Sequence, residues 1–216
     1  MTTSSPTFVP AAHYAVLTPL YESLVRPFSG RIWREIAREA TGRAPQGGTV
    51  VDLGCGPGTV LRFLKELRPD LTLAGTDIDP AMIRIASRKA AHERIDFVVA
   101  SIERQPREDR SIDLAMSNLM FHHLSLETKR AALREVRRIL RPGGAFLLCD
   151  FSVPDRKHFW LSVEFWKHIE PEVKPQIEGQ LFALAREAGA SIETLKTFYG
   201  CISLHLLTFP QSQSQP

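Results

Sequence analysis

The sequence predicts an α/β fold built on a doubly wound, mostly parallel sheet of seven strands. Two observations support this prediction. From Thr49 onward, short apolar runs of strand length alternate with segments of helical periodicity. Near the end of the chain, two strand-like runs flank Gly200 with no helix between them. Alternating strands and helices favour parallel neighbours and right-handed crossovers, whereas consecutive strands indicate an antiparallel hairpin at one edge.

Five strands are expected in the core, over 49–53, 71–76, 95–99, 112–117 and 145–149. The helices between them are expected over 59–67, from Pro80 to about Ala91, and over 127–140. Asp79 followed by Pro80 is a typical helix start, with Asp as the N-cap. Residues 141–144, Arg-Pro-Gly-Gly, are expected to end the third of these helices. A last helix over 175–188 should stop at Gly189, and the hairpin strands should cover 192–199 and 201–209.

Composition excludes several classes of protein. The chain has 216 residues, 44% hydrophobic and 24% charged, which is ordinary for a globular domain. A net charge of +3 is too small to require a nucleic acid or a membrane as partner. Cys55, Cys149 and Cys201 form neither a disulfide framework nor a metal-binding CxxC pair, so we expect a cytoplasmic protein without a metal. No run approaches the ~18 apolar residues of a membrane span, and no secretory signal is visible.

The strongest motif is Asp52-Leu53-Gly54-Cys55-Gly56-Pro57-Gly58, which leaves a strand and enters a helix. Glycines let a backbone turn sharply and approach a ligand closely, and the helix start offers free N–H groups. Taken alone, the run is also explained by a tight turn. Asp77 follows 19 residues after Gly58, at the end of the second strand, where a carboxylate can accept both hydroxyls of a ribose. Asp79 already supplies the helix cap, so Asp77 is better explained as a ribose ligand.

With these residues the chain resembles the class I S-adenosylmethionine-dependent methyltransferases, which have a Rossmann-like fold. The resemblance is greatest to the small-molecule branch, such as the quinone-biosynthesis methyltransferases. The matching segments are 50–58, 75–82, 111–118, 121–124 and 140–144. The resemblance implies S-adenosylmethionine as cofactor and S-adenosylhomocysteine as product. It also implies direct in-line methyl transfer to a small apolar or aromatic acceptor.

The resemblance assigns parts of the donor to particular residues. Asp52 and Asn118 would lie near the methionine moiety, and Asp77 would hold the ribose. The loop residues expected to wrap the methionine moiety are Gly54, Cys55, Gly56 and Gly58. Ile78 and Met82 would flank the adenine. The family often has an acidic residue after the third strand, and this chain has Ser101 there, so the Ser101 hydroxyl or the Ile102 backbone is expected to replace it.

The acceptor side is less clearly defined. His122 and His123 follow the fourth strand, and histidine has a pKa suited to taking a proton from an acceptor. Packing or helix capping explains them equally simply, and Asp150 is the next polar candidate. An aromatic segment after the fifth strand would suit an apolar acceptor, a lid core or a dimer surface; it contains Phe151, His158, Phe159, Trp160, Phe165, Trp166 and His168. Tyr14 and Tyr21 lie in an N-terminal helical stretch that is either a cap over the donor or scaffolding.

Two other functions remain open. The first is an RNA or protein methyltransferase, and the second is a protein that uses the donor pocket without methyl transfer. The arginines that would favour RNA are Arg130, Arg134, Arg137, Arg138 and Arg141, but their helical spacing is more typical of a solvated face. No Asn-Pro-Pro-Tyr or Pro-Cys follows the fourth strand, which disfavours amino-group methylation of DNA bases and cysteine-mediated methylation of pyrimidines. The oligomeric state is open, a homodimer included.

We expect one domain over 1–216. It would comprise an N-terminal helical cap over 1–48 and a donor-binding core over 49–150. A lid and last helix would follow over 151–190, then an edge hairpin over 191–210 and a polar tail over 211–216.

Overall fold

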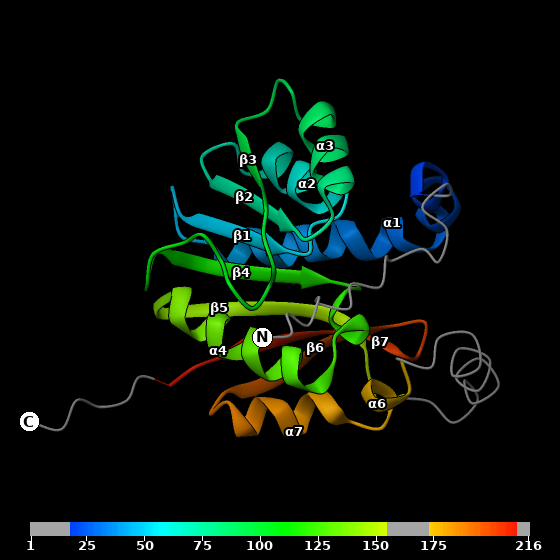
Figure 1. The fold of residues 1–216 in the computed structure, drawn as a ribbon, viewed down its shortest axis with the longest axis vertical. Helices are drawn as coiled ribbons and strands as arrows, with labels where there is room; N and C mark the ends of the chain where they lie inside the picture. The colour runs from blue at the N-terminus through cyan, green and yellow to red at the C-terminus, as the bar shows by residue number, and fades with distance from the viewer. Residues whose placement is uncertain (1–17, 155–172, 211–216) are drawn as a thin grey trace, which may run out of the picture.

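The computed structural model describes residues 18–154 and 173–210, with the backbone alone for residues 18–29. Its sheet has the order β3-β2-β1-β4-β5-β7-β6, and β7 runs antiparallel to both of its neighbours. Strands β1 to β5 are mutually parallel, so the predicted fold class is confirmed (Figure 1). The strands are β1 Thr49–Leu53, β2 Thr72–Asp77, β3 Ile95–Val99, β4 Ile112–Asn118, β5 Leu140–Phe151, β6 Ser191–Phe198 and β7 Ile202–Thr208.

Helices cover both faces of the sheet, because successive residues of a strand point to opposite sides. In β1, Val50 packs into the cluster formed with α1 (Thr18–Arg43), α2 (Thr59–Leu67) and α3 (Pro80–Lys89). The next residue, Val51, packs into the cluster formed with α4 (Leu126–Ile139) and α7 (Gln180–Glu187). Figure 1 shows α1 behind the sheet and α4 in front of it. Within the described ranges, no helix is long and apolar enough to cross a membrane.

The helix before residues 141–144 ends as predicted, at Ile139, but the predicted start of the next strand at residue 145 is wrong. Strand β5 begins at Leu140 and continues through these residues as a bulge. Ile112 of β4 pairs with Leu140, but Leu114 pairs with Ala145, so β5 has extra residues between the two pairs. Gly143 has a φ of +82°, which lets the strand accommodate them without a side-chain clash.

The single helix predicted over 175–188 is two helices, α6 (Val173–Ile177) and α7, separated at Gly179. Gly179 has a φ of +89°, and this left-handed residue ends the helical path. The predicted stop at Gly189 is confirmed, because the N–H groups of Gly189 and Ala190 donate to the carbonyls of Arg186 and Ala185, as in a Schellman motif. The hairpin around Gly200 is also confirmed.

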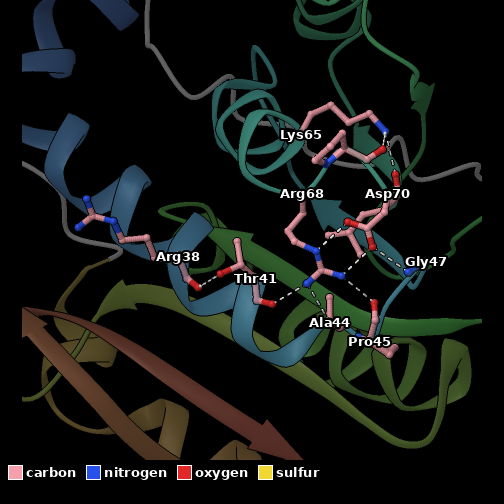
Figure 2. A network of polar contacts seen from close by, with 10 residues as sticks. Arg38, Thr41, Ala44, Pro45, Gly47, Lys65, Arg68 and Asp70 are labelled. Atoms are coloured by element: carbon pink, nitrogen blue, oxygen red, sulfur yellow. Dashed lines mark hydrogen bonds and ion pairs between the residues drawn. The ribbon is translucent and has the colours of Figure 1, made fainter.

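The described half of α1 is a structural layer on the sheet. Ile32 and Ile36 are buried against it. Figure 2 shows how Arg68 fastens the end of α1: its guanidinium donates to the carbonyls of Thr41, Ala44 and Pro45 and pairs with Asp70. The scaffolding interpretation therefore fits this half of the helix. Tyr14 lies outside the described residues, and Tyr21 lies where only the backbone is described.

Candidate functional site

The candidate site lies at the carboxyl ends of β1, β2, β4 and β5. Strands β1 and β4 are neighbours, and this brings Asp52 and Asn118 together from 66 residues apart. Asn118 Nδ2 donates to Asp52 Oδ1 at 3.0 Å. Both residues were predicted to lie near the same part of a ligand, and the structure places them in contact.

The charge on Asp52 is poorly compensated within the protein. The side chain is 1% exposed, and burial raises its pKa to about 7. The hydrogen bond from Asn118 opposes this rise, and the nearby charge of Asp77 adds to it. The Oδ1 atom of Asn118 is buried and has no hydrogen-bond partner. Together the two side chains place a carboxylate and an unpartnered amide oxygen close to each other, a pair of acceptors that suits an ammonium group.

At one glycine of the glycine-rich loop, an added side chain would point into open space. Gly54, Gly56 and Gly58 all have positive φ angles, of 73°, 51° and 75°. A Cβ on Gly54 would lie 2.7 Å from Met120 Cγ, and one on Gly58 would lie 2.8 Å from Phe97 Cζ. A Cβ on Gly56 would meet no atom within 4 Å. Gly54 and Gly58 are therefore required by packing, whereas the space over Gly56 is free to hold a ligand.

Asp77 joins this loop to the start of α3. Its Oδ2 accepts from Gly56 N–H and its Oδ1 from Asp79 N–H, both at 2.9 Å. Burial raises the pKa of Asp77, and these two hydrogen bonds oppose the rise. Asp79 caps α3 as predicted, because its side chain accepts from Ala81 N–H at 2.7 Å. Asp77 therefore does not cap the helix, and its carboxylate lies beside the open position of the loop.

The predicted adenine residues lie near this end of β2 and β3. Ile78 follows β2 and is 43% exposed, which is unusual for an isoleucine and suits contact with a flat ligand. Met82 is half-buried on α3. Ala100 N–H donates to the Asp77 carbonyl, so Ser101 emerges beside the end of β2. The Ile102 side chain is buried in the core, so only its backbone is available for a polar contact.

Cys55 also lies in the glycine-rich loop, and it is buried. Burial raises the pKa of its thiol well above the ordinary value, as it does for Cys149. Both cysteines are therefore packing residues rather than nucleophiles.

On the other side of the site, Asp150 holds His122. The histidine belongs to the short helix η1 (Phe121–His123) and is 3% exposed. Its Nδ1 lies 2.7 Å from Asp150 Oδ1, and its backbone N–H donates to Asp150 Oδ2 at 3.0 Å. Phe151 N–H donates to Asp150 Oδ1 at 2.7 Å. Burial alone raises the pKa of Asp150, but His122 and the backbone donors outweigh burial and leave this pKa below its ordinary value. An ionised Asp150 only accepts, so Nδ1 of His122 carries a proton.

The two predicted histidines differ in exposure. Their ring centroids are 3.9 Å apart, and the rings are tilted by 42°. His122 is sealed between Asp150 and the edge of the Phe151 ring, whereas the His123 side chain is half-buried. His123 is therefore the more accessible of the pair.

Several buried polar residues near this side were missed by sequence reasoning. Lys129 on α4 is 2% exposed, and its Nζ donates to Gln180 Oε1 at 2.9 Å. Its position three and four residues before Ala132 and Leu133 places it on the buried face of α4, and this spacing was a usable signal. Gln176 on α6 is fully buried. His205 on β7 contacts Ser152 Oγ and Thr194 Oγ1, and burial lowers its pKa to about 4.

Three of the five arginines near α4 have acidic partners, and Arg134 and Arg137 are exposed. Arg130 pairs with Glu187, Arg138 with Glu135 and Asp109, and Arg141 with Asp113. Pairing with acidic neighbours agrees with a solvated face. In the described part of the chain, no cluster of three His, Cys, Asp or Glu residues is placed to hold a metal. Phe151 is buried against α6. The other aromatic-segment predictions, His158, Phe159, Trp160, Phe165, Trp166 and His168, lie outside the described residues.

Comparisons with known proteins found similar methyltransferases. A family model described as "Methyltransferase domain" matches residues 50–144. The demethylmenaquinone methyltransferase of Deinococcus radiodurans is 29% identical over 77% of this chain and 70% of its own length. The malonyl-[acyl-carrier protein] O-methyltransferase of Salmonella typhimurium is 36% identical over 59% of this chain. The chain spans about half the length of several of the curated relatives that it matches, including the Salmonella protein at 49%.

The same fold occurs in a solved structure. A putative S-adenosyl-L-methionine-dependent methyltransferase from Methanococcus maripaludis superposes with a TM-score of 0.71 at 19% sequence identity. The superposition covers 98% of this chain and 100% of that one.

Proposed function

We propose that the chain carries a domain of the class I S-adenosylmethionine-dependent methyltransferases and that it methylates a small acceptor by direct in-line displacement. The observation that carries the proposal is the contact of Asn118 with Asp52, four residues before the open loop position at Gly56. A buried carboxylate and an unpartnered amide oxygen are the groups that an α-ammonium requires. The open loop position admits the chain that bears this ammonium.

The remaining donor contacts follow from the same edge of the sheet. Asp77 would accept from the ribose hydroxyls, and Ile78 would lie against the adenine. When bound, the donor supplies an already activated methyl group, so the protein's main contributions are alignment and exclusion of water. Asp52 would fix the position of the methionine end, and with it the direction in which the methyl group points.

On the acceptor side, we assign different roles to the two histidines. His123, the more accessible ring, would contact the acceptor and take the proton of a hydroxyl or carbon acceptor, whereas a carboxylate acceptor is already ionised and needs no base. His122 would orient His123 by ring contact and is itself held by Asp150. The negative charge of Asp150, acting through His122, favours a proton that arrives on the neighbouring imidazole. A small acceptor of the quinone or malonyl-thioester type is suggested by the names of the relatives.

The experiment is an incubation with labelled S-adenosylmethionine and, separately, a demethylated naphthoquinol or a malonyl thioester. We expect S-adenosylhomocysteine and a product heavier by about 14 Da, with His123→Ala lowering turnover of the naphthoquinol about 10²-fold at unchanged donor affinity. Binding of an RNA fragment that weakens steeply with salt would favour the RNA alternative instead. Donor binding without S-adenosylhomocysteine release would show that the pocket serves another purpose.

A further inference from the structure

Gln176 carries an amide that the protein itself does not use. The side chain is fully buried, and neither Oε1 nor Nε2 has a hydrogen-bond partner. Burying an amide without hydrogen bonds costs stability. A leucine at this position would avoid the cost. The amide is therefore best explained by a partner that the folded chain does not supply.

The position of Gln176 indicates which partner this is. Helix α6 packs against η1 and against β5, and Figure 1 shows it beside the carboxyl end of β5. Its Val173 and Ile177 are buried with Phe151, whose ring meets the His122 ring edge-on at 4.9 Å. Gln176 thus lies on a helix that packs against the histidine side of the site.

A second glutamine provides a direct comparison. Gln180 begins the next helix, and its Oε1 accepts from the buried Lys129 Nζ at 2.9 Å. That amide is satisfied within the protein and supports a buried charge. Two glutamines four residues apart therefore differ in one respect, because only the Gln180 amide has a structural partner.

We propose that Gln176 is a binding residue for the acceptor. The proposal rests on the proposed function of this site. An amide presents a donor and an acceptor side by side, and its natural complement is an oxygen group that does the same. We therefore assign to the acceptor a hydroxyl group, which can pair with both Oε1 and Nε2, or a carboxylate, one oxygen of which accepts from Nε2, while the methyl-accepting atom faces His123.

The test compares Gln176→Leu with the matched variant Gln180→Leu. We expect Gln176→Leu to raise the melting temperature by about 2–4 °C, because an unpaired buried amide is removed. Gln180→Leu is expected to lower it by a similar amount, because Lys129 loses its partner. The probes are 1,4-dihydroxynaphthalene, kept reduced, and malonyl-coenzyme A, each measured by thermal shift and calorimetry. At least one should bind the wild type, and Gln176→Leu should weaken that binding about tenfold or more while S-adenosylmethionine affinity stays within about twofold.

Three results would overturn the inference. A melting temperature lowered by Gln176→Leu would show that the amide is structural. Equal probe affinity in the wild type and Gln176→Leu would show that Gln176 does not contact the acceptor. Failure of both probes to bind the wild type would show that the ligand class is wrong. Gln176-dependent binding of a probe that is never methylated would instead leave this inference standing and contradict the proposed methyl transfer.

Discussion

Asp150 contacts both the ring and the backbone of His122. One carboxylate oxygen lies 2.7 Å from the ring Nδ1, and the other accepts the backbone N–H of the same histidine at 3.0 Å. The two residues are 28 positions apart and meet because β4 and β5 are neighbouring strands. These two contacts fix the position of η1 and determine that Nδ1 is the imidazole nitrogen that carries a proton.

The first prediction concerns this proton. In the wild type, His122 should show a protonated Nδ1 in long-range ¹H–¹⁵N spectra at pH 8. Asp150→Asn should disturb this state, because an amide presents N–H groups where all three neighbours of Asp150 are donors. The exposed His92 serves as an internal control and should not change. Identical His122 spectra in the two proteins would contradict a hydrogen bond between Asp150 and the His122 ring.

The second prediction concerns stability. The pKa of Asp52 is about 7 in the folded protein, against about 4 when unfolded, so the folded state binds this proton more tightly between these values. The free energy of unfolding therefore falls as pH rises from about 4 to 7, and titration of Asp52 lowers it by at most about 4 kcal/mol. Asp52→Asn should unfold at a higher temperature than the wild type at pH 8, and the difference should vanish near pH 4. A wild type that is the more stable protein at pH 8 would refute this account of Asp52.

The third prediction concerns the pH dependence of donor binding. An ammonium binds the ionised form of Asp52, so S-adenosylmethionine affinity should rise about tenfold per pH unit below 7. It should level off between pH 7 and 8, where the donor's own α-amino group begins to lose its proton. Calorimetry from pH 5.5 to 8 measures this curve. Asp52→Asn should bind weakly with a flat profile, and a flat profile in the wild type would remove Asp52 from the ammonium site.

The fourth prediction compares two alanine variants with similar backbone strain. Gly56 and Gly58 both have positive φ, so each alanine costs about 1 kcal/mol in strain. The new methyl group meets open space at Gly56 but Phe97 at Gly58. Gly56→Ala should therefore fold with a small loss of melting temperature yet lose donor affinity more than tenfold. Gly58→Ala should be clearly less stable. Full donor affinity in Gly56→Ala would show that the open space is not the donor site.

Local signals predicted most of the core. The strands over 49–53 and 95–99 and the helix over 59–67 have the predicted limits. A glycine or a charged residue precedes each of them, and Gly54 or Arg68-Pro69 follows two of the three. The cap at Asp79 was equally readable. The bulge at residues 141–144 was not, since Pro-Gly-Gly ends a helix as readily as it interrupts a strand, and only pairing with β4 decides between the two.

The acceptor side was less predictable because it depends on contacts between distant segments. His122 and Asp150 were each identified as candidates, but their pairing needs the register of β4 and β5. Gln176 gave no signal, because an unpartnered amide can be recognised only once its surroundings are known.

The fifth prediction is the most direct test of the central claim, that the edge formed by Asp52, Gly56 and Asp77 binds S-adenosylmethionine. It is a calorimetric titration of the wild type and Asp77→Asn at pH 7.5. We predict one donor site in the wild type and at least about tenfold weaker binding in Asp77→Asn, because one carboxylate oxygen is replaced by a donor that faces the ribose hydroxyls or the loop N–H groups. No heat of binding in the wild type, or equal affinity in the two proteins, would contradict the account.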